Sequence, residues 1–271
     1  MRAHKFLIIS YIVILALSFR AIFYLSSMSQ GDAPYLLQNL LKVYFHEPFA
    51  WTTIGTVLGG VNQFLWIWPY MAVVSLVGMI GRISPELLIR FFFYIPSIVL
   101  AAWGSYQFAS RFTVTTRVKI LTSLIYTVNT YFLLVLDGGQ VGISLAYGLF
   151  PVVLTLFAKA IDSDGRKPFL LYLLGLELIT LADPRVAIIS IAFAVLLFGT
   201  KLKKIVYVLP VWLGINMYWL YPLLTGAGTG FTSKLDQFSS LLNGLFFYAP
   251  HWSGNIYGVT TYPSILFAVF P

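Results

Sequence analysis

The chain contains no cysteine, which excludes disulfide bonds, catalytic thiolates and metal sites built on thiolates. It also contains no Walker motif, no dinucleotide-binding glycine fingerprint and no HExxH sequence. Histidine is scarce, with three residues in the whole chain. No compact local motif therefore indicates a particular chemistry.

Charge is scarce as well, since only 10% of the residues are charged and 59% are hydrophobic. Several nearly uncharged runs are long enough to cross a hydrocarbon core of about 30 Å. The composition predicts an all-α, polytopic transmembrane helix bundle that forms a single domain, 1–271. We expect this domain to be the N-terminal part of a longer module. The net charge of +8 then indicates basic cytoplasmic loops rather than binding to nucleic acid.

The apolar runs predict about seven membrane spans. They cover residues 6–25, 87–107, 119–136, 141–158, 168–182, 186–200 and 205–225. The predicted spans 168–182 and 186–200 are short and are joined by "ADPR". A re-entrant hairpin over 168–200 is therefore an alternative to two spans. Both ends of that hairpin would stay on the same side of the membrane, so the remaining topology does not depend on this choice.

The segment 64–80 is apolar but contains Pro69, and loop charge decides whether it crosses. If it stays at the outer surface and the N-terminus is inside, eleven of the 17 basic residues lie in the cytoplasm. They are Arg2, Lys5, Arg111, Arg117, Lys119, Lys159, Arg166, Lys167, Lys201, Lys203 and Lys204. A crossing at 64–80 would move most of them outside, which contradicts the positive-inside rule. We therefore predict that 64–80 does not cross.

This orientation places most acidic residues on the outer side of the membrane. They are Asp32, Glu47, Glu86, Asp137, Asp183 and Asp236. The apolar positions of 33–45 follow helical spacing, which predicts an interfacial helix at the outer surface. The residues 226–255 form a second outer loop that is rich in glycine and aromatic side chains.

Each outer acidic residue also has a structural explanation. Asp32 precedes Pro34 and suits a helix N-cap. Asp137 precedes two glycines, which a plain turn would explain. Asp183 and Arg185 could form a local ion pair in a tight turn, although a charged turn at that depth is costly unless it is paired or lines a polar cavity.

The stretch "RISPELLIR" predicts a helix start with Ser84 as N-cap, Pro85 at the first helical position and Glu86 in the first turn. These roles leave Arg90, four residues on, without a structural explanation. Arg20 and Glu177 fall inside predicted spans, and ionisable groups there are candidates for function.

Several of these features together resemble the GT-C superfamily of membrane glycosyltransferases. They are an outer acidic residue after the first span, an interfacial helix, and a non-spanning apolar helix before "RISPELLIR". The segment "YTVNTYFLLVLDGGQVGISLAYGLFPVVLTLFAKAI", 126–161, is similar to the arabinofuranosyltransferase-like branch, where a G-Q turn precedes an "AYxLxP" span. The resemblance covers most of residues 5–200.

The resemblance implies transfer of a sugar from a polyprenyl-phosphate donor to a glycan, lipid or protein acceptor at the outer face of the cell membrane. Asp32 matches the acidic residue that serves as base or metal ligand in that family, and Asp137 matches its second outer turn. The family has an acidic pair at the first position and this chain has one Asp, which leaves a divalent cation as cofactor open.

A phosphate leaving group needs a cationic clamp, for which Arg90 and Arg185 are the candidates near the outer surface. Glu47 and Asp183 are expected to support the site. Two other hypotheses stay open: a transporter or flippase for a lipid or sugar-lipid, and a non-catalytic membrane subunit that scaffolds a partner.

Overall fold

The computed structural model describes residues 2–23, 51–52, 60–61, 65–163, 165–198 and 203–225. The chain divides into two compact units, one of residues 1–128 and 132–226 and one of residues 129–131 and 227–271. Of the second unit only Asn129–Tyr131 are described, and every contact given below lies within the first unit. The predicted helix 33–45 and the loop 226–255 lie outside the described residues.

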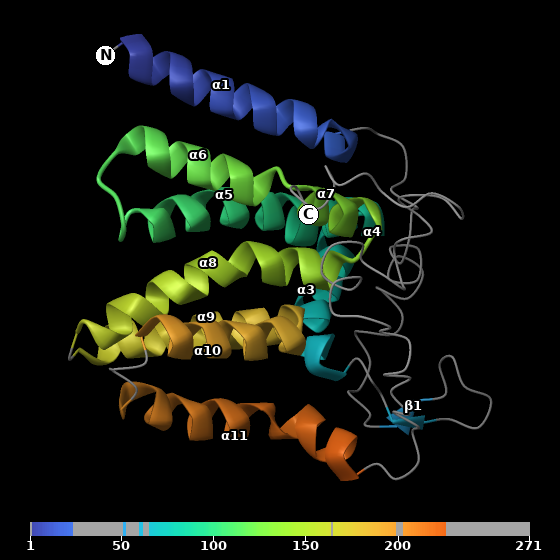
Figure 1. Ribbon diagram of the computed structural model, residues 1–271. Helices are drawn as coiled ribbons and strands as arrows, with labels where there is room; N and C mark the ends of the chain where they lie inside the picture. The colour runs from blue at the N-terminus through green and yellow to red at the C-terminus, as the bar shows by residue number, and fades with distance from the viewer. Residues whose placement is uncertain are drawn as a thin grey trace, which may run out of the picture. The chain divides into compact units, whose positions relative to one another are not determined.

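The described part of the chain is almost entirely helical, in agreement with the all-α prediction (Figure 1). The helices are α1 (Arg2–Ser18), α3 (Trp68–Gly81), α4 (Pro85–Ile89), α5 (Ile95–Ala109), α6 (Thr116–Thr127), α7 (Thr130–Asp137), α8 (Val141–Ile161), α9 (Arg166–Ala182), α10 (Pro184–Phe198) and α11 (Lys203–Thr225). Short 3-10 helices are η1 (Arg20–Phe23) and η2 (Leu65–Ile67), and a π-helical turn, η3 (Arg90–Tyr94), joins α4 to α5. A short antiparallel ladder, β1 (Trp51–Thr52) with β2 (Gly60–Val61), is the one departure from helix that we had not predicted.

Three of the described helices are long and apolar enough to cross a membrane: Pro85–Ala109, Val141–Ile161 and Tyr207–Thr225. They coincide with the predicted spans 87–107, 141–158 and 205–225. The predicted span 119–136 is broken into α6 and α7, which are bent by 42° and make a fourth candidate if they count as one span. The described part of the segment 64–80 is helical, and Leu65–Gly81 is one of the shorter apolar helices. The other predicted spans and the side on which 64–80 lies stay predictions.

Helix α8 is the centre of the packing and contacts α5, α9 and α10 (Figure 1). Two glycines bring α5 and α8 together. A Cβ added to Gly148 of α8 would collide with the backbone carbonyl of Ser97, and one added to Gly104 of α5 would lie 2.6 Å from Val152 Cγ2. Small residues permit such close approach between membrane helices, where van der Waals contact drives association.

The helix start predicted from "RISPELLIR" is confirmed. Ser84 is the N-cap of α4 and its side chain accepts a hydrogen bond from the Leu87 N–H at 3.4 Å, with Pro85 and Glu86 in the first turn. The sequence did not predict the π-helical turn that follows at Arg90–Tyr94. Such turns widen an α-helix locally and are frequent at functional sites.

An ion pair between Arg111 and Asp162 joins two turns at the far end of α8. Arg111 follows α5, and Asp162 follows α8 directly. Since α8 has 21 residues, this pair and the residues before Val141 are separated by about 31 Å at 1.5 Å per residue. That length is close to the thickness of a hydrocarbon core.

Candidate functional site at the start of helix α8

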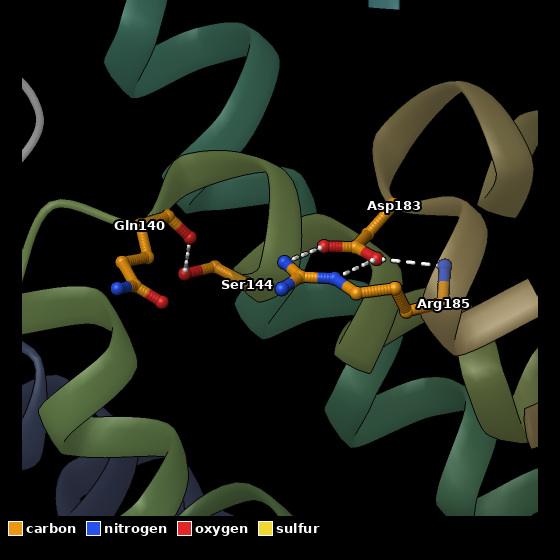
Figure 2. Close-up of polar contacts among 4 residues, drawn as sticks. All are labelled: Gln140, Ser144, Asp183 and Arg185. Carbon is orange, nitrogen blue, oxygen red and sulfur yellow. Dashed lines mark hydrogen bonds and ion pairs between the residues drawn. The ribbon is translucent and has the colours of Figure 1, made fainter. Parts of the chain in front are cut away.

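Two turns that the sequence analysis singled out meet where α8 begins (Figure 2). One is the turn between Asp137 and Gln140, and the other is the α9–α10 junction around Asp183. Gly142 makes the contact, because a Cβ at this position would lie only 2.6 Å from the carbonyl oxygen of Ala182. A larger residue at 142 would push the two turns apart.

Asp183 and Arg185 form the ion pair that the sequence suggested, and two parallel hydrogen bonds join the guanidinium group to the carboxylate. Asp183 Oδ1 accepts from the Arg185 backbone N–H at 2.9 Å and from Nε at 3.1 Å, and Oδ2 accepts from Nη2 at 2.6 Å (Figure 2). The backbone contact makes Asp183 the cap of α10, with Pro184 at the first helical position. The structural explanation of this turn is therefore confirmed.

The two partners differ strongly in exposure. The side chain of Asp183 is 4% exposed, whereas that of Arg185 is 73% exposed. The buried carboxylate thus orients a guanidinium group that stands at the surface. Because two parallel N–H···O bonds constrain the guanidinium plane, Arg185 can meet an anion with little further ordering.

Asp137 lies in the last turn of α7, and the glycines after it have the structural role proposed for them. Gly139 has a φ of 68°, its N–H donates to the Leu136 carbonyl, and the Gln140 N–H donates to the Val135 carbonyl. This is a Schellman C-cap, which favours glycine at the left-handed position.

The cap explains the glycines and leaves the carboxylate of Asp137 unexplained. It is exposed, and among the described residues its side chain has no hydrogen-bond partner. A negative charge in the last turn opposes the helix dipole by about 0.3–1 kcal/mol. The fold therefore gains nothing evident from an acid at this position, which favours a role in function.

Arg90 occupies the first position of the π-helical turn and is 8% exposed. We had expected it to reach the outer surface, and the structure places it in the helix packing instead, together with Phe93 of the same turn. The hydroxyl of Tyr70 donates to the carbonyl of Phe92 within this turn at 2.5 Å. The turn η3 also contacts α8, and Tyr94 at its end is buried.

Asp32 and Glu47 lie outside the described residues, as do His46 and His251. Within the described ranges, no three acidic or histidine side chains are grouped so that they could hold a metal ion. Both oxygens of Asp183 bind Arg185, and Asp137 is a single carboxylate. The described residues at the start of α8 therefore do not form a divalent-cation site.

Two residues of this site were not predicted. Gly142 brings the turns together, and Ser144 donates through its hydroxyl to the Gln140 carbonyl at 2.9 Å. The signal available in the sequence was the pair of glycines, Gly142 and Gly148, inside an otherwise apolar helix, because glycine there often marks a close approach.

Comparison of the chain with protein-family models, with curated proteins and with solved structures finds no match.

Proposed function

We propose that this protein is a membrane glycosyltransferase of the GT-C type, which transfers a sugar from a polyprenyl-phosphate donor to an acceptor hydroxyl. The acceptor is a glycan, a lipid or a protein. The observation that carries the proposal is the exposed Arg185 guanidinium, held by a buried carboxylate beside the turn that contains Asp137. A fixed cation for a phosphate and a carboxylate without a structural role are the groups that this reaction needs.

In this proposal Arg185 binds the phosphate of the donor lipid and Asp183 positions its guanidinium. During transfer, the bond between the anomeric carbon and the phosphate oxygen breaks, and negative charge develops on the departing phosphate. A preorganised guanidinium group stabilises that charge. Arg90 adds positive charge from within the helix packing and does not touch the donor.

The acceptor hydroxyl needs a base to take its proton while its oxygen attacks the anomeric carbon. We assign that role to Asp32, in line with the resemblance, with Glu47 supporting it. Asp137 binds and orients the acceptor through a hydrogen bond to its carboxylate. No step of this reaction is assigned to a metal ion.

The topology completes the proposal. We place the start of α8 at the outer face of the cell membrane and the Arg111–Asp162 end in the cytoplasm, with the N-terminus inside, seven spans up to residue 225 and α3 at the outer surface. The support is the separation of about 31 Å between the two polar ends of α8 and the basic residues near the Arg111–Asp162 end.

The test is a transfer assay on the full chain in liposomes, with polyprenyl-phosphate-linked pentoses and hexoses as donors. Asp32→Asn should lower the rate on the order of 10²–10⁴-fold. Asp137→Asn should raise the KM for the acceptor roughly 10–100-fold, as expected for a lost hydrogen bond to a charged group. Arg185→Lys should weaken donor use, because lysine cannot keep the bidentate bonds to Asp183 and bind the phosphate at the same time.

Asp162→Asn is the matched control, since it removes a carboxylate at the opposite end of α8. It should leave transfer unchanged. Transfer that survives neutral replacements at Asp32 and Asp137 would refute the assignment of the site.

Transport of a lipid or sugar-lipid is the second candidate, and Glu177 favours it. This carboxylate lies within the predicted span 168–182 and accepts a hydrogen bond from Asn216 of α11. Among the three helices that could cross a membrane, α11 is the least buried. An ionisable group at such a depth is typical of transport pathways. A transporter would move a lipid-linked sugar between leaflets without forming a new glycosidic bond, and product analysis in the same liposomes distinguishes the two.

A further inference from the structure

The turn that joins α5 to α6, residues 110–115, carries exposed apolar side chains. Val114 is 92% exposed and Phe112 is 67% exposed. A turn that faces water is normally polar, as is the turn between α8 and α9, whose sequence over 162–165 is "DSDG". The apolar side chains of the α5–α6 turn therefore indicate surroundings other than water.

This turn is held in shape by hydrogen bonds. The backbone N–H groups of Phe112 and Thr113 both donate to the Ala109 carbonyl, at 3.0 Å and 3.1 Å. The Thr115 N–H donates to Thr113 Oγ1 at 3.2 Å. The ring of Phe112 also meets that of Phe108 edge to face, with centroids 5.2 Å apart. The turn thus presents its apolar side chains in a defined arrangement.

Exposed basic side chains gather around the turn. Helix α5 contacts α6 and α8, and α8 contacts α9, so the α5–α6 and α8–α9 turns lie at one end of these helices (Figure 1). The Arg111–Asp162 ion pair joins them. The other exposed basic residues at this end are Arg117, Lys159, Arg166 and Lys167. Among the described residues Asp162 is the one acid there, which leaves an excess of positive charge.

Helix stability does not explain these charges. Arg117 lies in the first turn of α6, Arg166 and Lys167 lie in the first turn of α9, and neither turn contains an acid. Positive charge in the first turn opposes the helix dipole. The positive-inside rule accounts for the side of the membrane on which such residues lie. It does not account for the exposed Phe112 and Val114 between them.

Apolar side chains flanked by cations are typical of a segment at a membrane surface. The apolar groups enter the boundary between headgroups and acyl chains, and the cations attract anionic lipids. Lys119 and Tyr106 fit the same level, because Nζ of the lysine lies 5.8 Å from the centroid of the tyrosine ring and both residue types occur where a membrane meets water. A soluble acidic partner would account for the charges alone.

We propose that the turn 110–115 lies in the headgroup layer of the membrane and that the basic side chains around it bind anionic phospholipids. Phe112 and Val114 enter the upper acyl region, while Arg117 and Arg166 bind headgroup phosphates, for which guanidinium groups are bidentate donors. The proposal does not depend on sugar transfer, because none of these residues belongs to the site at the start of α8.

The first test measures the depth of the turn. Because the chain has no cysteine, Val114→Cys can carry a single environment-sensitive fluorophore. In liposomes of phosphatidylglycerol and phosphatidylcholine, a phospholipid spin-labelled near the top of its acyl chain should quench it more strongly than iodide present on both sides. The matched control is Gly165→Cys in the polar α8–α9 turn, which iodide should quench more strongly. Both positions are exposed, so neither change should disturb the fold.

Iodide quenching of Val114→Cys as strong as that of Gly165→Cys would overturn the placement in the membrane. Weak quenching of Val114→Cys by both agents would overturn it too, since protein, such as a second copy of this chain, would then cover the turn.

The second test measures lipid binding to the full chain by native mass spectrometry. The probes are phosphatidylglycerol and phosphatidylcholine with identical acyl chains. The wild-type protein should bind phosphatidylglycerol more tightly, on the order of tenfold, because each basic side chain near the headgroups contributes a factor of about five. The double variant Arg117→Gln with Arg166→Gln should lose most of this preference.

Arg82→Gln is the matched control, because Arg82 is also exposed and lies before the other end of the helix Pro85–Ala109. It should keep the preference. Equal binding of the two lipids by the wild-type protein would overturn the assignment to anionic lipids. A preference that survives in the double variant, or that Arg82→Gln lowers equally, would overturn the assignment to this end of the helices.

Discussion

Helices α8 and α11 are both long and apolar enough to cross a membrane, yet they are held in different ways. In their most apolar stretches 67% of α8 is buried, against 22% of α11. Helix α8 packs closely at Gly148, while a Cβ added at Gly214 of α11 would meet nothing within 4 Å. Close packing therefore holds α8, and a few hydrogen bonds hold α11.

This difference in packing indicates which helix can hold functional side chains in fixed positions. The described residues of the proposed site, Asp137, Asp183 and Arg185, lie at the start of α8, where Gly142 packs against the α9–α10 junction. Precise positioning of reacting groups benefits from such a rigid support. Helix α11 has no comparable close contact: the indole and amide groups of Trp219 and Asn216 are buried and bond to each other, while much of the apolar surface of the helix is exposed.

The largest expected effect comes from substituting Gly148, with Gly214 as the comparison. Gly148→Ala should destabilise the protein by about 3 kcal/mol or more, because the new methyl group collides with the backbone of Ser97 and α5 must move away. Gly214→Ala is the matched control and should be neutral or slightly stabilising, since alanine favours the helix by up to about 1 kcal/mol. Thermal unfolding of both variants in detergent checks this, and equal stability of the two would refute the packing argument.

A smaller and local effect is expected for Asn216→Leu. It leaves the N–H of the buried Trp219 without its partner, which costs about 1–3 kcal/mol, and the half-buried Glu177 carboxylate can turn to solvent. Helix α11 should open while α8 stays protected, as hydrogen exchange followed by mass spectrometry would show. Glu177→Gln should leave α11 protected. If α8 lost protection together with α11, the two helices would not be held independently.

Loss of a single hydrogen bond in the packing of α8 should lower the free energy of unfolding by a smaller amount. Tyr126 and Tyr147 each donate a hydroxyl to the other's carbonyl, at 2.9 Å and 2.8 Å, and their rings stack. Tyr147→Phe keeps the stacking and loses one bond, for an expected loss of about 0.5–1.5 kcal/mol in the free energy of unfolding. A loss as large as that of Gly148→Ala would mean that the hydroxyl, rather than close packing, determines how α8 is held.

The smallest effect is expected at the far end of α8. Arg111 and Asp162 form an exposed ion pair, and Asp162→Asn should change the free energy of unfolding by less than about 1 kcal/mol. Added salt should reduce even this difference, because it screens exposed charges. Chemical denaturation at low and high salt measures it, and a large, salt-independent effect would show that the pair belongs to the core.

Local features of the fold could be predicted from the sequence, and distant contacts could not. The cap at Ser84 and the tight pair of Asp183 with Arg185 follow from residues within a few positions of each other, and both are present. The contact of Gly142 with Ala182 and the bond from Asn216 to Glu177 join residues far apart in the chain. Such contacts depend on how the helices pack, which hydrophobic pattern alone does not determine.

In the candidate site, too, contacts between residues far apart in the chain could not be predicted. The sequence singled out Asp137, Asp183 and Arg185, but not that Gly142 brings their two turns together. It placed Arg90 near the outer surface because this residue lies near the end of a predicted span, whereas the structure buries its side chain in the helix packing. The sequence also identified Glu177 as an unusual charge in a span without finding its partner.

The central claim is that the start of α8 lies at the outer face of the membrane and its far end lies in the cytoplasm. Because the chain has no cysteine, single cysteines at Gln140 and Ser110 report on each end without background. A maleimide that cannot cross the membrane should label Gln140→Cys in intact cells, and Ser110→Cys only after the cells are opened. Labelling of Ser110→Cys in intact cells, with Gln140→Cys protected, would contradict the proposed topology and the placement of the site.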